Sequence, residues 1–375
     1  MLKRFSVTNF KNFKTQTSLI LDQPCNYGFN EEIIKNNIVT KGIIYGINGS
    51  GKSNLALALF DIIFHLTDKE KSPDRYQLYL NLNSNKPTAD FEYLFCFNGV
   101  DVLYKYSKTD VTTLTHENLK IDGQEVFDFD YNANKGYTTL EGAGTLNLTQ
   151  VSQNNPSFTS KLSRVKYIAS NSLLVDNKIN NAFRDFVAFV DNMLMFYSLD
   201  SRGYQGLMVG RDSFTKGIIR ENKVEEFQKF LASQNVQYDL VVGEFNGEKE
   251  LFCKFSKSTV PFMSVASTGT KSLALFYYWF IKMSYASFVC IDEYDAFYHF
   301  ELAQSLVELT KSRLQNTQII MSTHNTDLLS NDILRPDAYF VLQNNQIKSL
   351  NELTNKDIRR AHNLQKMYKA GSFNE

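Results

Sequence analysis

One eight-residue segment constrains the fold of this 375-residue chain more than any other. Residues 46–53 read G-I-N-G-S-G-K-S, an apolar run at 42–47 leads into them, and an apolar helical pattern follows at 54–66. This pattern predicts a buried strand, a glycine-rich loop and a helix in direct succession. Such a succession is typical of α/β folds built on a parallel sheet.

The same segment fits the pattern of a phosphate-binding loop, or P-loop. Backbone N–H groups can surround a phosphate where no side chain intervenes, as at Gly46, Gly49 and Gly51. In this pattern Lys52 reaches the β and γ phosphates of ATP, and the Ser53 hydroxyl binds Mg²⁺. An ordinary glycine turn is the alternative, but it does not require a strand before it and a helix after it. We predict nucleotide contacts from Asn48, Gly49, Ser50, Gly51, Lys52, Ser53 and Asn54.

A second apolar strand ends in two acids. Residues 287–293 read S-F-V-C-I-D-E, so Asp292 and Glu293 come at the carboxyl end of the strand, where α/β sheets bind ligands. Asp292 is the candidate Mg²⁺ ligand, and Glu293 is the candidate general base for an attacking water. Taken alone, the pair is equally typical of a solvated turn. The P-loop in the same chain favours the catalytic interpretation.

Two further motifs gain meaning from their place in the chain. Residues 319–325 read I-I-M-S-T-H-N and put His324 at the end of the next strand, a candidate contact for the γ phosphate or the attacking water. A lone histidine is more often structural. Residues 264–272 read S-V-A-S-T-G-T-K-S before an apolar helix, which fits either an anion site or a plain N-cap. The order of all the motifs favours nucleotide contacts from Ser267, Thr268, Gly269 and Thr270.

Composition excludes some classes of protein. Lys plus Arg and Asp plus Glu are 40 each, so only a local basic stripe would support nucleic-acid binding. The four cysteines form no C-x-x-C pair, which argues against zinc and for a reduced, cytosolic compartment. The polar N-terminus is unlike a signal peptide, and the apolar stretch 272–291 fits a buried helix and strand better than a membrane span. We expect a cytoplasmic protein with no membrane segment.

We expect the chain to be organised in four segments. Residues 1–66 and 261–375 form the two halves of the P-loop core, and no heptad run predicts a long coiled coil. Residues 67–165 form an antiparallel β lobe with hairpin signals at Asn98-Gly99 and Asp122-Gly123. Residues 166–260 form a helical lobe, with helices at 172–198 and 222–234 and a strand pair around Asn246-Gly247. A last helix is expected to begin near Thr354.

The order of these motifs resembles that of ABC-type ATPase heads, and within that class the RecF, SMC and OLD branch. The opening V-T-N-F-K-N-F is similar to the first strand of that branch, where a basic residue at the position of Lys11 often meets nucleotide. Residues 292–299, D-E-Y-D-A-F-Y-H, resemble its D-E-P-E-x-H-x-H segment, with Tyr294 replacing Pro and Phe297 replacing the first His. The tail, from S-T-H-N-T-D-L-L-S to D-I-R-R-A-H-N-L-Q-K-M-Y-K-A-G-S-F, is similar to compact prokaryotic AAA-type ATPases of the RloA-like, abortive-infection-associated kind.

The resemblance implies an α/β P-loop NTPase head of ABC type, with an inserted antiparallel β lobe and a helical lobe. It implies that the signature at 267–270 of one copy closes over the ATP in the P-loop of another, so we expect a homodimer or a higher oligomer. The signature reads S-T-G-T in place of S-G-G-Q. The glutamine that senses Mg²⁺ in such heads has no clear counterpart, since Gln77 fits poorly.

The resemblance also frames the function. OLD proteins carry a TOPRIM nuclease after the ATPase, but only about 50 residues follow His324 here, fewer than a domain of ordinary size. We therefore expect an ATPase switch subunit of a phage-defence system that controls a separate effector from an adjacent gene. Two alternatives stay open. One is a RecF-like DNA repair or recombination ATPase, and the other is an autonomous nuclease or toxin that acts through Asp128 and Asp130.

Overall fold

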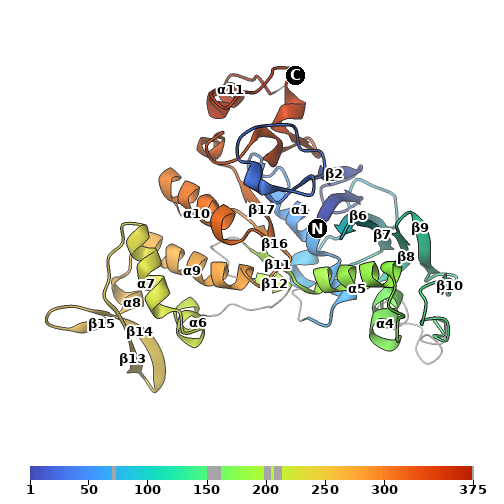
Figure 1. Ribbon diagram of the computed structural model, residues 1–375, viewed down its shortest axis with the longest axis horizontal. Coiled ribbons are helices and arrows are strands. Elements are labelled where there is room, and N and C mark those ends of the chain that lie inside the picture. The colour runs from blue at the N-terminus through green and yellow to red at the C-terminus, as the bar shows by residue number, and fades with distance from the viewer. Residues whose placement is uncertain (70–72, 150–161, 198–203, 207–212, 297, 374–375) are drawn as a thin grey trace.

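The computed structural model of the chain describes residues 1–69, 73–149, 162–197, 204–206, 213–296 and 298–373. Two seven-stranded sheets dominate these residues, with helices packed around them (Figure 1). One sheet is mainly parallel and carries the P-loop, and the other is antiparallel. A smaller lobe of helices and a three-stranded sheet extends to one side (Figure 1).

The mainly parallel sheet has the strand order β12-β11-β16-β17-β5-β18-β19. Its five inner strands run parallel, and β12 and β19 pair antiparallel at the two edges. The inner strands β5, β16 and β17 are buried at every residue, which explains their continuous apolar runs. The strands are β5 (Lys41–Tyr45), β11 (Met193–Phe196), β12 (Tyr204–Gly206), β16 (Phe288–Ile291), β17 (Gln318–Thr323), β18 (Tyr339–Gln343) and β19 (Gln346–Ser349).

Helices pack against this sheet and bury its apolar side chains. Trp279 of α9, for example, stacks on Phe196 of β11 with the ring centroids 4.4 Å apart. The helices of this part are α1 (Lys52–Phe60), α2 (Ile63–Leu66), α9 (Thr268–Met283), α10 (Phe300–Arg313) and α11 (Leu364–Lys369), with 3₁₀ turns η4 (Thr326–Leu328), η5 (Pro336–Ala338) and η6 (Leu350–Leu353).

The antiparallel sheet has the order β10-β9-β8-β7-β6-β1-β2, so the two N-terminal strands belong to it. Its strands alternate buried and partly exposed residues, as expected of a sheet with one solvated face. The hairpin residues Asn98 and Asp122 have φ near +50°, and the glycines after them have φ near +80°. The strands are β1 (Leu2–Thr8), β2 (Thr17–Ile20), β6 (Ala89–Phe97), β7 (Val100–Lys108), β8 (Leu114–Ile121), β9 (Gln124–Asp130) and β10 (Lys135–Thr138).

The remaining elements flank these sheets. Helix α5 packs against the antiparallel sheet, with Phe186 and Phe189 against Phe95 at centroid distances of 5.4 and 5.3 Å. The remaining helices and 3₁₀ turns are α4 (Arg164–Asn171), α5 (Lys178–Asp191), α6 (Phe214–Arg220), α7 (Val224–Ser233), α8 (Phe262–Val265), η1 (Glu31–Ile33) and η2 (Pro73–Tyr76). The remaining strands are β3 (Ile34–Lys35), β4 (Ile38–Val39), β13 (Leu240–Phe245), β14 (Glu248–Lys254) and β15 (Thr259–Pro261).

This topology confirms the predicted α/β class, a P-loop head with an antiparallel β lobe and a helical lobe. Among the described residues no helix is longer than the 16 residues of α9, so this part of the chain holds no long coiled coil. The apolar stretch 272–291 folds as most of α9 and then β16. None of the described helices has the length and apolarity needed to cross a membrane.

Two element predictions were wrong. The helix expected at 172–198 is α5 alone, and residues 193–196 form the buried strand β11 of the main sheet. The run M-L-M-F is too short for its periodicity to separate strand from helix, and pairing with β16 decides the outcome. The last helix begins at Leu364 instead of near Thr354, because its N-cap is Asn363, whose side chain accepts from the Lys366 N–H; the capping box of this region, Ser349 with Glu352, starts the 3₁₀ turn η6.

Candidate nucleotide site

Three neighbouring parallel strands bring the predicted motifs to one edge of the main sheet. Strand β16 leads into Asp292 and Glu293, β17 leads into His324, and β5 leads into Gly46. The order β16-β17-β5 makes these ends adjacent. The Gly46 N–H donates to the Thr323 carbonyl at 3.3 Å, which joins the start of the P-loop to the residue before His324. The carboxyl edge of the sheet is where α/β proteins bind their ligands.

The P-loop has the backbone that its glycines allow. Gly49 and Gly51 have φ of +80° and +103°, which side chains rarely adopt. A Cβ at Gly51 would also lie 2.4 Å from the Asn12 amide nitrogen. Asn48, Gly49 and Ser53 are exposed at the tip of the loop and the start of α1. The loop therefore presents backbone amides, a helix N-terminus and a hydroxyl to solvent, as phosphate and Mg²⁺ binding require.

Lys52 is folded back onto its own loop. Its ammonium group donates to the carbonyls of Gly46 at 2.8 Å and Ile47 at 3.3 Å, and the residue is buried. Burial lowers the pKa of Lys52, and the carboxylates of Glu293, Asp292 and Asp295 act in the opposite direction. The P-loop lysine and the acids after β16 are therefore close enough to interact electrostatically.

Asp292 and Glu293 leave the strand in different environments. Asp292 is buried and accepts a 2.6 Å hydrogen bond from the Ser322 hydroxyl, which itself accepts from the Glu293 N–H at 2.8 Å. Glu293 is half-buried with φ of +48°, a left-handed backbone that costs a non-glycine residue about 1 kcal/mol or more. The chain thus turns sharply between a buried carboxylate and one nearer to solvent.

The oxygen ligands present suit Mg²⁺. Mg²⁺ takes one or two protein oxygens and completes its shell with water and phosphate oxygens. The Ser53 hydroxyl and the Asp292 carboxylate supply that type of donor. Among the residues that the structure describes, no group of three or more His, Cys, Asp or Glu side chains could hold a metal by itself.

Ser322 and Asp295 are site residues that the sequence motifs had not singled out. Asp295 is buried, and its Oδ1 has no hydrogen-bond partner within the described part of the chain. Burial raises the pKa of Asp295, against hydrogen bonds from Thr323 and Asn325 and the nearby His324. In the sequence, Asp295 is marked as the third acid of D-E-Y-D, and Ser322 is marked by its place directly before T-H. His324 itself is exposed at the end of β17.

The N-terminal turn contacts the P-loop helix through Asn12, whereas Lys11 points to another segment. The Lys11 ammonium donates to the Gln77 carbonyl at 2.7 Å, and burial lowers its pKa. The Asn12 side chain accepts from the Asn54 amide at 2.7 Å and donates to Asn345 at 2.9 Å. The ammonium group of Lys11 is thus bound to a backbone carbonyl. The neighbouring Asn12 links the N-terminal turn to α1 and to the turn at Asn345, next to Gly51.

The signature residues lie in another part of the head. Ser267 caps α9, accepting from the Thr270 N–H at 3.1 Å, with the Ser267 and Thr270 hydroxyls 2.9 Å apart. Ser267 and Thr268 are exposed, Gly269 is half-buried and Thr270 is buried. Helix α8 directly precedes this cap, so α9 begins in the lobe of α7 and α8, apart from α1 (Figure 1). Within one chain the structure does not bring the signature to the P-loop.

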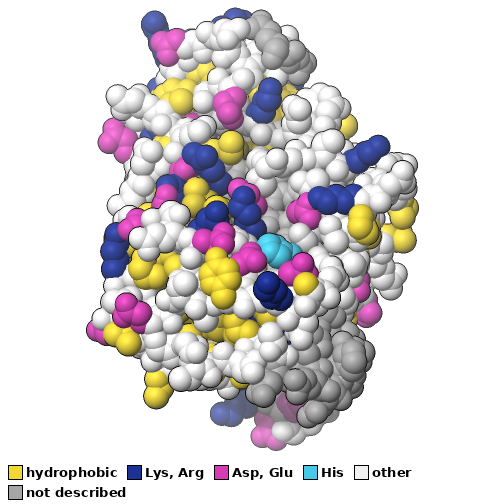
Figure 2. Space-filling model, turned by 90° about the vertical axis from the view of Figure 1, so that its right-hand side faces the viewer, with side chains coloured by type: hydrophobic (Ala, Val, Ile, Leu, Met, Phe, Trp, Pro, Cys, Tyr) yellow, Lys and Arg dark blue, Asp and Glu magenta, His cyan; other side chains and the backbone are white. Residues whose placement is uncertain are grey.

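The D-x-D pair of β9 makes ordinary sheet and turn contacts. Asp128 accepts from the Asn118 amide at 2.8 Å and lies 3.0 Å from His116 Nε2, and Asp130 accepts from the N–H groups of the next turn at 2.8 and 3.0 Å. Figure 2 shows acidic and basic side chains interspersed over that side of the molecule. Cross-strand ion pairs in the antiparallel sheet include Glu92–Lys105 and Glu125–Lys120. Among the described residues of that face, no basic stripe is visible (Figure 2).

The solved structures to which the chain is similar include SMC head domains. The chain is similar to the SMC head domain from Thermotoga maritima, with 14% identity and a TM-score of 0.46 over 93% of this chain and 98% of that one. It is also similar to an Smc head bound to the C-winged helix domain of ScpA, with 13% identity, a TM-score of 0.48 and coverage of 94% and 98%. A third similar structure is an Smc head domain from Pyrococcus furiosus with an extended coiled coil, bound to the C-terminal domain of ScpA. It has 11% identity and a TM-score of 0.47, over 94% of this chain and 97% of that one.

The family comparison is more decisive. No curated protein matches the chain in sequence. Residues 43–330, which include the P-loop, the signature, the two acids and His324, match the family model described as "AAA domain, putative AbiEii toxin, Type IV TA system". The match confirms the resemblance to compact AAA-type, abortive-infection-associated ATPases that the motifs indicated. The chain therefore belongs to this family of AAA-domain P-loop ATPases.

Proposed function

We propose that the chain hydrolyses Mg²⁺-bound ATP between two copies of its head, and that this cycle is a switch that controls a separate effector in phage defence. One observation carries the catalytic part. The strand order β16-β17-β5 places the acids after β16 and the P-loop after β5 at one edge of the sheet, and the carboxylates of Glu293, Asp292 and Asp295 oppose the lowering of the Lys52 pKa by burial, which supports a single shared site. ATP hydrolysis needs that combination of a phosphate-binding cation and a carboxylate base.

Each residue has a role in this account. The loop amides and Lys52 bind the phosphates, and the Lys52 ammonium exchanges the Gly46 and Ile47 carbonyls for phosphate oxygens. Ser53 and Asp292 hold Mg²⁺, which neutralises phosphate charge when bound. Glu293 accepts a proton from the attacking water, and its half-buried place beyond Asp292 leaves it access to that water. His324 orients the water or contacts the γ phosphate.

A second copy completes the site. Ser267 and Thr268 are exposed, and the start of α9 is separated from α1 within the chain (Figure 1). We propose that Ser267, Thr268, Gly269 and Thr270 of one chain close over the nucleotide held by the other. A homodimer then has two composite sites. Closure of the two heads gives ATP a means to change the relative positions of the lobes.

The role in defence rests on the family. Its description names a toxin–antitoxin system, which fits an ATPase that acts in the cytoplasm with the product of a neighbouring gene. The test is to express the chain with and without that gene and to measure bacterial survival and nucleic-acid integrity during phage infection. We expect protection only when both genes and an intact P-loop are present. Protection by this chain alone would contradict the separate effector.

A toxin that acts by itself is the second candidate, because the family description includes the word. Cell death on expression of this chain alone, lost on changing Asp128 and Asp130 to Ala, would favour it. A RecF-like repair function predicts ATP-dependent affinity for DNA ends. On the face in Figure 2, the described residues have mixed charge and offer such DNA no continuous positive surface.

A further inference from the structure

The C-terminal segment 356–373 is anchored beside the nucleotide site. Ile358, Leu364 and Phe373 are buried. The buried side-chain amide of Asn331 donates to three carbonyls of this segment, those of Arg359 at 3.1 Å, Arg360 at 3.3 Å and His362 at 3.0 Å. One amide in the segment that follows His324 thus fixes the turn that leads into α11.

Helix α11 in turn contacts two parts of the site. On one side Tyr368 packs edge-on against Tyr45, with the ring centroids 4.9 Å apart. Tyr45 is the last residue of β5, directly before Gly46. On the other side the Gln365 amide donates to the carboxylate of Asp327, and the Lys369 ammonium lies 3.6 Å from it. Asp327 belongs to η4, three residues after His324.

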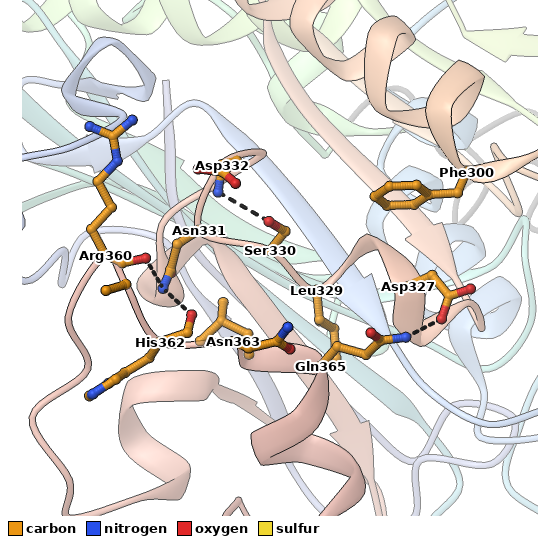
Figure 3. Close-up of a pocket in the computed structure, with 12 residues that line it drawn as sticks. Phe300, Asp327, Leu329, Ser330, Asn331, Asp332, Arg360, His362, Asn363 and Gln365 are labelled. Atoms are coloured by element: carbon orange, nitrogen blue, oxygen red, sulfur yellow. Dashed lines mark hydrogen bonds between the residues drawn. The ribbon is translucent and has the colours of Figure 1, made fainter.

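Beyond Asp327 the loop that carries His324 is held by Leu328, which is buried and whose carbonyl accepts from the Tyr339 hydroxyl at 2.7 Å, whereas Asp327 itself is exposed. The Asp327 N–H donates to the Asn325 side chain at 2.9 Å, a contact within the loop. A pocket of about 590 Å³ separates Asp327 and Gln365 from Phe300 at the start of α10 (Figure 3). Among the described residues, the Asp327 carboxylate contacts the rest of the head through two side chains of α11, the hydrogen bond from Gln365 and the ion pair with Lys369. The Lys369 pair is exposed, and such pairs hold geometry weakly.

We propose that Gln365 is a positioning residue for ATP hydrolysis. Through Asp327 it holds the loop of His324 in the place where His324 meets the γ phosphate or the attacking water. Hydrolysis is sensitive to such placement, because an error of about 1 Å in a reacting group costs up to about 10²-fold in rate. The inference rests on the role of His324 proposed above and adds the tail of the chain to the machinery that sets the rate.

The test uses the full chain, steady-state ATP turnover and binding of a fluorescent ATP analogue. Gln365→Glu sets a carboxylate against Asp327, and Gln365→Leu removes the donor without adding charge. Both are expected to lower kcat about tenfold while KM and analogue affinity stay within about twofold. Lys366→Gln, an exposed change on the same helix, is the control and should leave kcat unchanged.

A second substitution separates positioning from general damage. Asp327→Asn keeps an acceptor for Gln365 and should be nearly wild type. In the double variant Asp327→Asn with Gln365→Glu, the amide introduced at position 327 donates to the carboxylate introduced at position 365, so kcat should return to within about twofold of wild type. A loss of stability alone would not be restored by this pairing. Wild-type kcat in both Gln365 variants, or no rescue in the double variant, would overturn the inference.

The role of His324 is measured in the same assay. If His324→Ala leaves kcat at the wild-type value, the proposed role of His324 fails, and this inference fails with it. If His324→Ala lowers kcat and the Gln365 variants do not, only this inference fails. When both lower kcat, adding Gln365→Glu to His324→Ala should cause no further loss, because the loop no longer carries the group that it positions.

Discussion

The hydroxyl of Ser322 donates a 2.6 Å hydrogen bond to the carboxylate of Asp292, the candidate Mg²⁺ ligand. The same oxygen accepts from the Glu293 N–H at 2.8 Å. Ser322 lies on β17, and the two acids follow the neighbouring strand β16. One side chain of β17 therefore fixes the turn that follows β16. The orientation of the candidate Mg²⁺ ligand and of the candidate general base therefore depends on the strand that leads into His324.

Ser322→Ala should lower ATP turnover about tenfold, because the Asp292 carboxylate and the Glu293 N–H both lose a buried partner. The free energy of unfolding should fall by about 1–3 kcal/mol for the same reason. Ser322→Thr keeps the hydroxyl and is the matched control. Steady-state turnover and urea denaturation of the three proteins check this. Equal turnover of the Ala and Thr variants would show that the hydroxyl does not support the acids.

Lys52→Ala should remove ATP binding or hydrolysis, since the phosphates lose the cation of the P-loop. Lys14→Ala changes an exposed lysine outside the site and is the control. Equilibrium binding of a fluorescent ATP analogue, together with phosphate release, measures both steps. Unchanged affinity and turnover in Lys52→Ala would contradict the P-loop assignment.

Ser267→Arg should block hydrolysis while ATP binding persists, because it places bulk on the face that meets the second copy. A mixture of Ser267→Arg and Lys52→Ala chains forms dimers with one intact composite site, so activity should return on mixing. Turnover across a series of mixing ratios is the measurement. Ser267→Arg with wild-type turnover would remove the signature from the site, and activity that no ratio restores would argue against the arrangement in trans.

Lys41 gives a prediction about pH. Its buried ammonium donates to the carbonyls of Leu314 at 3.0 Å and Thr317 at 2.6 Å, and burial lowers its pKa from 10.5 to about 8. Between about pH 8 and 10.5 the unfolded chain binds this proton more fully than the folded chain. The Lys41 contribution to the free energy of unfolding is therefore least favourable below pH 8 and rises with pH across that window, by at most about 1.4 kcal/mol per pH unit.

Lys41→Gln keeps donors for the two carbonyls and removes the titration. The unfolding free energy of wild type minus that of this variant should increase from pH 8 to pH 10. Urea denaturation at several pH values in that range measures the difference, with the exposed substitution Lys249→Gln as the control. A difference that is independent of pH would contradict the lowered pKa.

The sequence alone predicts the motifs that depend on local spacing. Gly49 and Gly51 have the positive φ that a phosphate loop needs, and the strand–loop–helix succession appears at β5 and α1. Hairpin patterns such as Asp122-Gly123 also depend on only a few residues, so the antiparallel β lobe can be predicted from the sequence. The conformation of each of these segments is determined by residues within one turn or one strand of it.

Local sequence patterns do not predict contacts between distant segments of the chain. Asn12 and Asn345 meet across 333 residues, and no local pattern marks either as a P-loop neighbour. The bond between Gln365 and Asp327 depends on where the tail docks, and that follows from burial of Leu364 and Phe373 in a core built by the whole chain. Strand β11 was missed for the same reason, since its place beside β16 is a property of the assembled sheet.

The central claim is that Glu293 drives ATP hydrolysis in a site shared by two chains. The most direct measurement is sedimentation velocity of Glu293→Gln with and without Mg²⁺-ATP, beside its steady-state turnover. The account predicts retained ATP binding, turnover at least about 10²-fold below wild type and a dimer that accumulates only with ATP, because the nucleotide stays unhydrolysed between the heads. Wild-type turnover, or a monomer at saturating ATP, would contradict it.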